Sequence, residues 1–200
     1  MGVGVVMGRT RAGDLGRRQL IEAAAQTIYE HGYQEATVAR IAEASGLSAG
    51  NIHYHFGGKD GLLEATMRAL LGDIHEAMIE QLSRAASPLE RVRAVIRTNL
   101  AEPLFRPEIC RVWLHFWAQT AHQPRLARLE RINATRFRAN LQEGLRHLVP
   151  QPAVAGLARE IVAMVDGLWM ARAQRNPTLD AESASRRVFR YLDRRLRDLA

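Results

Sequence analysis

The side chains best suited to recognise a nucleic acid gather in one short stretch. Residues 48–56 read SAGNIHYHF, so amide, imidazole and phenol groups surround two apolar positions, Ile52 and Phe56. The amide of Asn51 pairs a donor with an acceptor, which matches the major-groove edge of adenine, while tyrosine and histidine can bond phosphates and pack on thymine methyl groups. Ile52 and Phe56 are the expected core contacts. This composition favours a short helix whose polar edge reads duplex DNA.

Lys59 follows this stretch at the start of a long predicted helix. An ammonium at that position lies beside the positive end of the helix dipole and the free N–H groups of the first turn, which together make a phosphate anchor. The alternative for His53 and His55 is that they are plain surface residues. Because they lie two residues apart, they do not share a helix face and do not form a metal site.

A second group of residues could bind a small cation. Trp113, Phe116 and Trp117 occur at i, i+3 and i+4, so they line one side of a single helix. Core packing is the usual role of such a stripe. Further along the chain Asp166 interrupts the apolar run IVAMVDGLWM, where an ionised carboxylate costs several kcal/mol unless it is paired.

Two kinds of partner can satisfy Asp166. One is an arginine of a neighbouring helix, with Arg172 and Arg136 as candidates. The other is a ligand cation, and a quaternary ammonium suits this role because it has no N–H to donate and binds to aromatic faces beside an anion. Glu130 is a second candidate anion. The predicted ligand-binding residues are Trp113, Phe116, Trp117, Asp166 and Trp169.

The elements that position these residues are all helical. Apolar residues recur at three- and four-residue spacing and alternating β-type runs are absent, which predicts an all-α fold. Capping residues and prolines divide the chain into nine helices. Their predicted ranges are 15–31, 38–44, 49–55, 60–85, 88–101, 107–121, 124–148, 153–174 and 180–198.

Residues 37–48 have the pattern of a helix-turn-helix. Thr37 precedes a short helix, Gly46 allows a left-handed turn, and Ser48 is placed to begin the next helix. The long helix at 60–85 is expected to join this N-terminal unit to a larger bundle, so that the two are mechanically coupled. The last two helices carry apolar stripes that could complete the core or pair with a twin chain.

Composition excludes several classes of protein. The 200 residues are 47% hydrophobic, with no apolar run long enough to cross a bilayer, so disordered, collagen-like and membrane-spanning architectures are excluded. A single cysteine, Cys110, forms no internal disulfide, which favours a reducing compartment and a cytoplasmic location. Residues 1–13 lack the order of a secretory signal, since Arg9 and Arg11 follow the apolar part, and are expected to be a disordered tail.

The net charge of +7 does not by itself locate a nucleic-acid site. Residues 1–60 hold six basic and six acidic side chains, whereas residues 91–147 hold 11 basic and four acidic ones. The excess positive charge therefore lies away from the predicted helix-turn-helix. Any DNA contact depends on specific residues rather than on bulk charge.

The N-terminal pattern resembles the helix-turn-helix signature of the TetR family of transcriptional repressors. The resemblance spans residues 17–64 and includes Thr37, the SGLS turn at 45–48, the GNIHYHF segment at 50–56 and Lys59. The aromatic phosphate-binding position of the family corresponds to His53, with Tyr54 one place later. The DNA contacts predicted on this basis are Thr37, Arg40, Ser48, Ala49, Asn51, His53, Tyr54, His55 and Lys59.

The likeness extends into the larger half of the chain. Segments 62–68, 113–118, 122–124 and 166–170 are similar to those of choline-responsive repressors of this family, which control genes of glycine betaine synthesis. The resemblance implies a DNA-binding domain at 14–58, an effector-binding and dimerisation domain at 59–200, and choline as the effector. It also implies a homodimer, formed through the last two helices, on a palindromic operator.

Other functions remain as alternatives. A TetR-type regulator of efflux that senses another organic cation or a lipophilic ligand would share the DNA chemistry, and a helical adaptor would bind only protein. No nucleophile elbow, phosphate loop or metal-spaced set of histidines and carboxylates occurs, so we expect no catalytic residues, no metal and no cofactor beyond the small-molecule effector.

Overall fold

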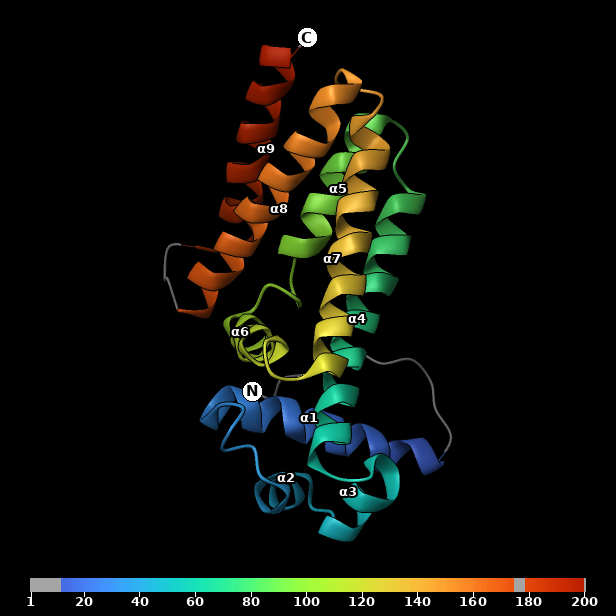
Figure 1. Ribbon diagram of the computed structural model, residues 1–200, viewed down its shortest axis with the longest axis vertical. Helices are drawn as coiled ribbons and strands as arrows, with labels where there is room; N and C mark the ends of the chain where they lie inside the picture. Colours follow the sequence, from blue (N-terminus) through green and yellow to red (C-terminus); the bar gives the residue numbers. More distant parts are fainter. Residues whose placement is uncertain (1–11, 175–178, 200) are drawn as a thin grey trace. The chain divides into compact units, whose positions relative to one another are not determined.

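The computed structural model describes residues 12–174 and 179–199, with side chains described from Leu15 onward. Residues 1–11 of the predicted N-terminal tail lie outside this range. The described residues form nine α-helices and no strand, which confirms the all-α prediction (Figure 1). Among these residues, no helix is long and apolar enough to cross a membrane.

The helices fall close to their predicted ranges. They are α1 (Ala12–His31), α2 (Val38–Ser45), α3 (Ala49–Phe56), α4 (Lys59–Ser83), α5 (Pro88–Leu100), α6 (Pro107–Thr120), α7 (Pro124–Leu145), α8 (Gln151–Ala173) and α9 (Ala181–Leu199). The largest differences are that α1 begins three residues before its predicted start and α7 ends three residues before its predicted end.

Local capping explains most of the boundaries. The Thr37 hydroxyl accepts a hydrogen bond from the backbone N–H of Arg40 at 3.3 Å, and Gly46 ends α2 with φ of 69°, in the left-handed region. Ser87 caps α5 by accepting from the N–H of Glu90 at 3.2 Å. Ser48 occupies the cap position of α3 but makes no capping hydrogen bond with its side chain.

The chain divides into two compact units, which we describe separately. One contains the described residues up to Asp73 together with Arg111–Glu130, and the other contains Ile74–Cys110 together with the described residues from Arg131 onward. Helices α4, α6 and α7 therefore contribute residues to both. The predicted domain division at residues 58 and 59 concerns function and stays a prediction.

The first unit is built around the helix-turn-helix. Ile41 of α2 and Ile52 of α3 are fully buried, as is Leu20 of α1, so these three helices share one core. The turn from α3 into α4 is tight. A Cβ on Gly61 would lie 2.0 Å from the carbonyl oxygen of Phe56, so only glycine fits at that position.

The second unit packs α5 against both α8 and α9 (Figure 1). The apolar stripe of α8 is buried at Val154, Leu157, Ile161 and Val165, and that of α9 at Val188 and Leu192. Helix α7 approaches α5 closely at Gly144, where a Cβ would lie 2.6 Å from Cγ2 of Val92. These contacts confirm that apolar residues of the last two helices complete the core of a single chain.

Candidate nucleic-acid interface and effector site

Helix α3 separates its apolar and polar residues as expected. Ile52 is fully buried, whereas Tyr54 is 84% exposed and His53 is exposed. Asn51 and His55 are partly exposed, and the Tyr54 and His55 rings meet edge to face with their centres 4.9 Å apart. Because α3 is anchored from one side only, its polar edge is free to enter a DNA groove.

The predicted contacts flanking α3 also lie at the surface. Thr37, Ser48 and Ala49 are exposed. Arg40 is exposed as well, and its guanidinium lies 3.5 Å from the carboxylate of Glu35. An exposed ion pair of this kind stabilises a protein by about 1 kcal/mol or less. Arg40 can therefore leave the Glu35 carboxylate and bind a phosphate instead.

Lys59 has a structural role that its sequence position did not indicate. Its Nζ donates a hydrogen bond to the carbonyl oxygen of Gln34 at 3.1 Å and lies 5.8 Å from the centre of the Tyr33 ring. These contacts hold the first residue of α4 against the turn between α1 and α2. The ammonium has three N–H groups, so contact with a phosphate as well stays a prediction.

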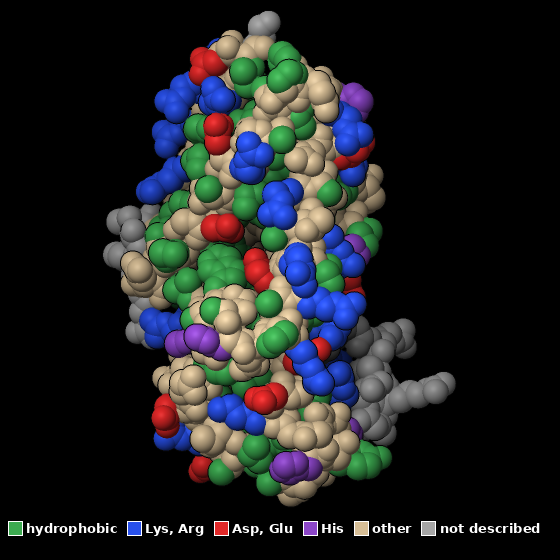
Figure 2. Space-filling view, in the orientation of Figure 1, with side chains coloured by type: hydrophobic (Ala, Val, Ile, Leu, Met, Phe, Trp, Pro, Cys, Tyr) green, Lys and Arg blue, Asp and Glu red, His purple; other side chains and the backbone are tan. Residues whose placement is uncertain are grey.

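Excess positive charge is not concentrated on the helix-turn-helix. On the face shown in Figure 2, Lys and Arg side chains gather over α7 and α9, and few lie over α2 and α3. Exposed arginines of α9 are Arg186, Arg187, Arg190, Arg194 and Arg197. The distribution agrees with the count along the sequence.

The aromatic stripe, Trp113, Phe116 and Trp117, lies on one side of α6 within the first unit. The ring centres of Trp113 and Phe116 are 5.1 Å apart, and those of Trp113 and Trp117 are 6.2 Å apart. Trp113 and Phe116 are buried, while Trp117 is partly exposed. The stripe therefore has the geometry of a packed aromatic cluster with one ring at its edge.

Asp166 lies on α8 in the second unit and is only partly exposed. Burial raises the pKa of its carboxyl to about 6, and the nearby positive charge of Arg138 opposes this rise. No ion pair of Asp166 within 4 Å occurs among the described residues. The carboxylate is thus desolvated without a close cationic partner.

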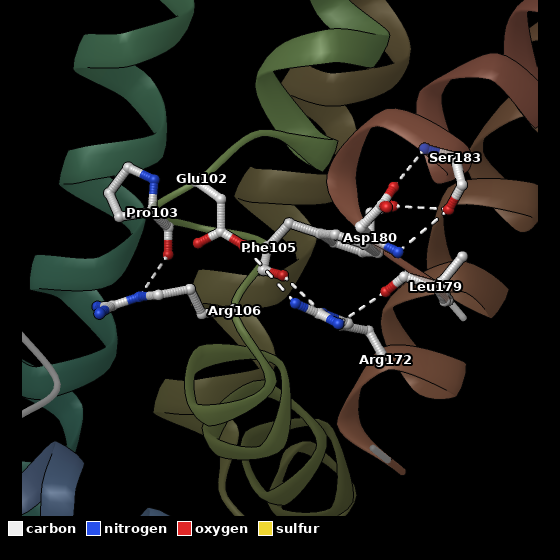
Figure 3. A network of polar contacts seen from close by, with 8 residues as sticks. All are labelled: Glu102, Pro103, Phe105, Arg106, Arg172, Leu179, Asp180 and Ser183. Atoms are coloured by element: carbon white, nitrogen blue, oxygen red, sulfur yellow. Dashed lines mark hydrogen bonds and ion pairs between the residues drawn. The ribbon is translucent and has the colours of Figure 1, made fainter. Parts of the chain in front are cut away.

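Arg172, one of the two candidate arginine partners of Asp166, does not pair with it. Arg172 instead donates to the carbonyl oxygens of Phe105 at 3.2 Å and Leu179 at 2.7 Å, and its guanidinium lies 3.7 Å from the Glu102 carboxylate (Figure 3). It joins the end of α8 to the loop before α6 and to the residues before α9. The other candidate, Arg136, is exposed on α7 and forms no ion pair among the described residues.

Trp169 is buried three residues after Asp166. Its indole N–H donates to the carbonyl oxygen of Asn99 at 2.7 Å, and its ring meets Phe105 edge to face. The other candidate anion, Glu130, is partly buried, with its Oε2 atom inaccessible to solvent. The structure places the aromatic stripe in one unit and the pair Asp166 and Trp169 in the other, so a single cage of all five residues stays a prediction.

Two residues with site-related contacts were not identified from the sequence. Tyr33 receives a hydrogen bond from Nε2 of Gln123 at 2.7 Å, and the two lie 90 residues apart in the chain. The sequence pointed to Gln123 only as the residue before a helix-starting proline and as part of segment 122–124, without giving it a role. Nothing in the local pattern of either residue indicates its tertiary partner.

Comparison with known families matches both halves of the chain. Residues 88–197 match the BetI-type transcriptional repressor C-terminal family. Residues 20–66 match the bacterial regulatory proteins of the tetR family. The first match covers more than half of the chain.

Relatives and solved structures agree with this assignment. The HTH-type transcriptional regulator BetI 1 of Chromohalobacter salexigens is 39% identical over 181 residues, 90% of each chain. BetI of Stenotrophomonas maltophilia is 40% identical over 185 residues, 92% of this chain and 94% of the relative.

Among solved structures, a transcriptional regulator from Pseudomonas aeruginosa PAO1 has a TM-score of 0.80 at 24% identity, covering 94% of this chain and 93% of its own. A regulator from Saccharomonospora viridis, solved in complex with choline, also has a TM-score of 0.80, at 21% identity, covering 90% of this chain and 96% of its own. At these identities the likeness concerns the fold alone. The matches to families and relatives show that the chain belongs to the TetR family, in its BetI type, and that it is a ligand-responsive transcriptional repressor and not an enzyme.

Proposed function

We propose that this repressor senses choline and controls genes for glycine betaine synthesis. The observation that carries the proposal is the match of residues 88–197 to the BetI-type C-terminal family. All of the predicted ligand-binding residues lie within this range. The relatives named BetI match over about nine-tenths of the chain. The S. viridis regulator in complex with choline supports a quaternary ammonium as a ligand that this fold accommodates.

The chemistry of Asp166 supports a cationic effector. Above its pKa of about 6 the carboxylate is ionised, partly buried and without an ion pair among the described residues. A bound quaternary ammonium would neutralise this charge without needing a hydrogen-bond acceptor of its own. The aromatic stripe offers π faces, with Trp117 the most accessible of its three rings.

The proposed operator contacts follow from α3. Asn51 is proposed to read a base edge, while Tyr54, His53, Lys59 and the exposed Thr37 bind the phosphate backbone. Asn51→Ala is expected to weaken operator binding about 5- to 150-fold and to leave binding to random duplex DNA nearly unchanged. Equal losses on both DNAs would contradict a base contact by Asn51.

We further propose that two chains pair through α8 and α9. Nothing in the described chain lies within 4 Å of a Cβ built at Gly167 or Gly156. On the same exposed side of α8 lie Ala163 and Met170, the latter 49% exposed. Small residues in open space allow a twin helix to approach closely, and a twofold dimer suits a palindromic operator with half-sites about 34 to 36 Å apart.

The test measures operator affinity by fluorescence anisotropy while choline is titrated, with choline affinity measured by calorimetry. Choline is expected to change operator affinity about 5- to 150-fold, the usual range of coupling between two sites. Ethanolamine, a primary ammonium of similar size, serves as the control and should have little effect. Unchanged operator affinity at saturating choline would remove choline as the effector, and a response only to tetraphenylphosphonium would favour the efflux regulator.

A further inference from the structure

Helix α6 contacts the end of α1 through the face opposite its aromatic stripe. Arg111 and His115 lie about half a turn away from Trp113. The guanidinium carbon of Arg111 lies 5.3 Å from the centre of the Tyr29 ring of α1. The His115 ring borders Gly32, with its Cε1 atom 3.4 Å from the position of a Cβ there. One helix thus carries the candidate effector residues and also packs on α1.

The corner between α6 and α7 makes a second contact with the same unit. Nε2 of Gln123 donates to the hydroxyl of Tyr33 at 2.7 Å, and Tyr33 is only 6% exposed. The backbone of Gln123 is held on both sides, since its N–H donates to Gln119 and its carbonyl accepts from Ala127, each at 3.0 Å. Burial raises the pKa of Tyr33, so its phenol stays protonated near neutral pH.

Tyr33 also contacts the beginning of α4. Nζ of Lys59 lies 5.8 Å from the centre of the Tyr33 ring and bonds to the carbonyl oxygen of the next residue, Gln34. Lys59 follows α3 by a turn of two glycines, both with positive φ. One buried phenol therefore touches the α6–α7 corner and the helix that continues directly from α3.

We infer that the Tyr33–Gln123 contact is a positioning contact that transmits the effector signal to α3. The inference rests on the ligand response of this repressor and adds the path by which it reaches the DNA-binding helices. A shift of α6 at its aromatic stripe moves Gln123, and Gln123 acts through Tyr33 on the start of α4. The path runs from α6 through the turn between α1 and α2 to the first residue of α4, whereas the sequence indicated only coupling along the long helix α4.

The experiment uses the full-length protein with three variants, Tyr33→Phe, Gln123→Ala and the double variant. Tyr33→Phe removes only the hydroxyl that accepts the hydrogen bond. Thr27→Val is the matched control, because it removes a buried hydroxyl from α1 that donates its hydrogen bond to the Ala23 carbonyl, within the same helix. Each protein is tested for melting temperature, operator affinity, effector affinity and the change in operator affinity caused by the effector.

Both single variants are expected to keep operator and effector affinities within about threefold, while the effector-induced change in operator affinity falls about three- to tenfold. In the double variant the effector-induced change in operator affinity should fall no further than in either single variant, because the same contact is removed in all three proteins. A wild-type response in both single variants, additive losses in the double variant, or an equal loss in Thr27→Val would overturn the inference.

A second measurement needs no effector. It therefore tests the Tyr33–Gln123 contact even if choline is not the effector of this protein. Linkage between the two sites is reciprocal, so operator binding must also change α6. We expect operator DNA to slow amide hydrogen exchange in residues 115–123 of the wild-type protein and of Thr27→Val, and to slow it much less in Tyr33→Phe. The same slowing in Tyr33→Phe as in the wild type would contradict the proposed path.

Discussion

The carboxyl of Asp166 makes the stability of the fold depend on pH. Its pKa of about 6 in the folded chain lies above the value of about 3.9 expected in the unfolded chain. Folding therefore favours the protonated form. Below about pH 4 the carboxyl is protonated in both states and does not lower the free energy of unfolding. Between about pH 4 and 6 the free energy of unfolding falls as the unfolded chain ionises first, and above about pH 6 the full destabilisation is present.

Asp166→Asn is expected to stabilise the protein at pH 7.5 because it removes a desolvated charge. The gain in unfolding free energy should be about 2 kcal/mol at pH 7.5, allowing for partial exposure, and should fall well below about 1 kcal/mol at pH 4.5. Urea unfolding at both pH values measures it. Asp198→Asn, at an exposed position of α9, is the control and should change little at either pH. A gain independent of pH would show that desolvation of the charge is not the cause.

The same carboxylate should make choline binding depend on pH. A cation binds the ionised form, and choline itself does not titrate, so affinity should weaken about tenfold between pH 7.5 and pH 5. Asp166→Asn should bind more weakly at pH 7.5 and lose this pH dependence. Calorimetry at the two pH values separates the effects. Identical pH profiles for the variant and the wild type would assign the anion to another residue, with Glu130 as the next candidate.

At the scale of elements, the turn from α3 to α4 is the most constrained junction of the first unit. Gly57 ends α3 with φ of 72°, Gly58 has φ of 134°, and Gly61 leaves no room for a side chain beside the Phe56 carbonyl. The turn fixes where α4 begins relative to α3. We therefore expect the first turn of α4 and the end of α3 to move together.

Two glycines of α4 provide a matched pair of variants. Gly61→Ala places a methyl group 2.0 Å from the carbonyl oxygen of Phe56 and should destabilise the protein by about 1 to 3 kcal/mol, with weaker operator binding. Gly72→Ala meets nothing within 4 Å and should stabilise α4 by roughly 0.5 to 1 kcal/mol through helix propensity. Thermal unfolding of both variants measures the difference. Equal effects would show that the turn can relax.

At the scale of the whole molecule, the proposed pairing of two chains is expected to govern operator binding. A monomer would place one α3 in one half-site. In a dimer the second α3 is held near the second half-site at a high effective concentration, so the dimer binds the whole operator more tightly than a monomer does. The open space at Gly167 is where a twin helix would approach most closely. Pairing and DNA affinity are therefore expected to fall together.

Gly167→Arg is expected to give a monomer, because a long charged side chain would prevent close approach of the twin helix. Light scattering coupled to size exclusion should show half the wild-type mass, and operator affinity should fall at least about 100-fold. Ala139→Arg, on the exposed face of α7, is the control and should remain a dimer. A dimeric Gly167→Arg protein would exclude this part of α8 from the interface.

The sequence by itself determined the features that arise within one or two helical turns. The spacing of apolar residues predicted the all-α class, and capping residues and prolines divided the chain into the nine described helices, because both signals are local. Thr37 and Gly46 were recognisable as caps since a capping hydrogen bond or a left-handed turn involves neighbours in the chain. The exposure of Tyr54 beside buried Ile52 follows from the same periodicity.

Only the tertiary structure decided which distant residues meet. Arg172 bonds to Phe105 and Leu179 rather than to Asp166, and Tyr33 bonds to Gln123 across 90 residues of chain. The open space at Gly167 likewise depends on which helices pack beside α8. Such contacts depend on how whole helices pack, and packing is decided by the summed burial of many side chains. The residues next to a side chain in the sequence therefore do not indicate which distant residue it contacts.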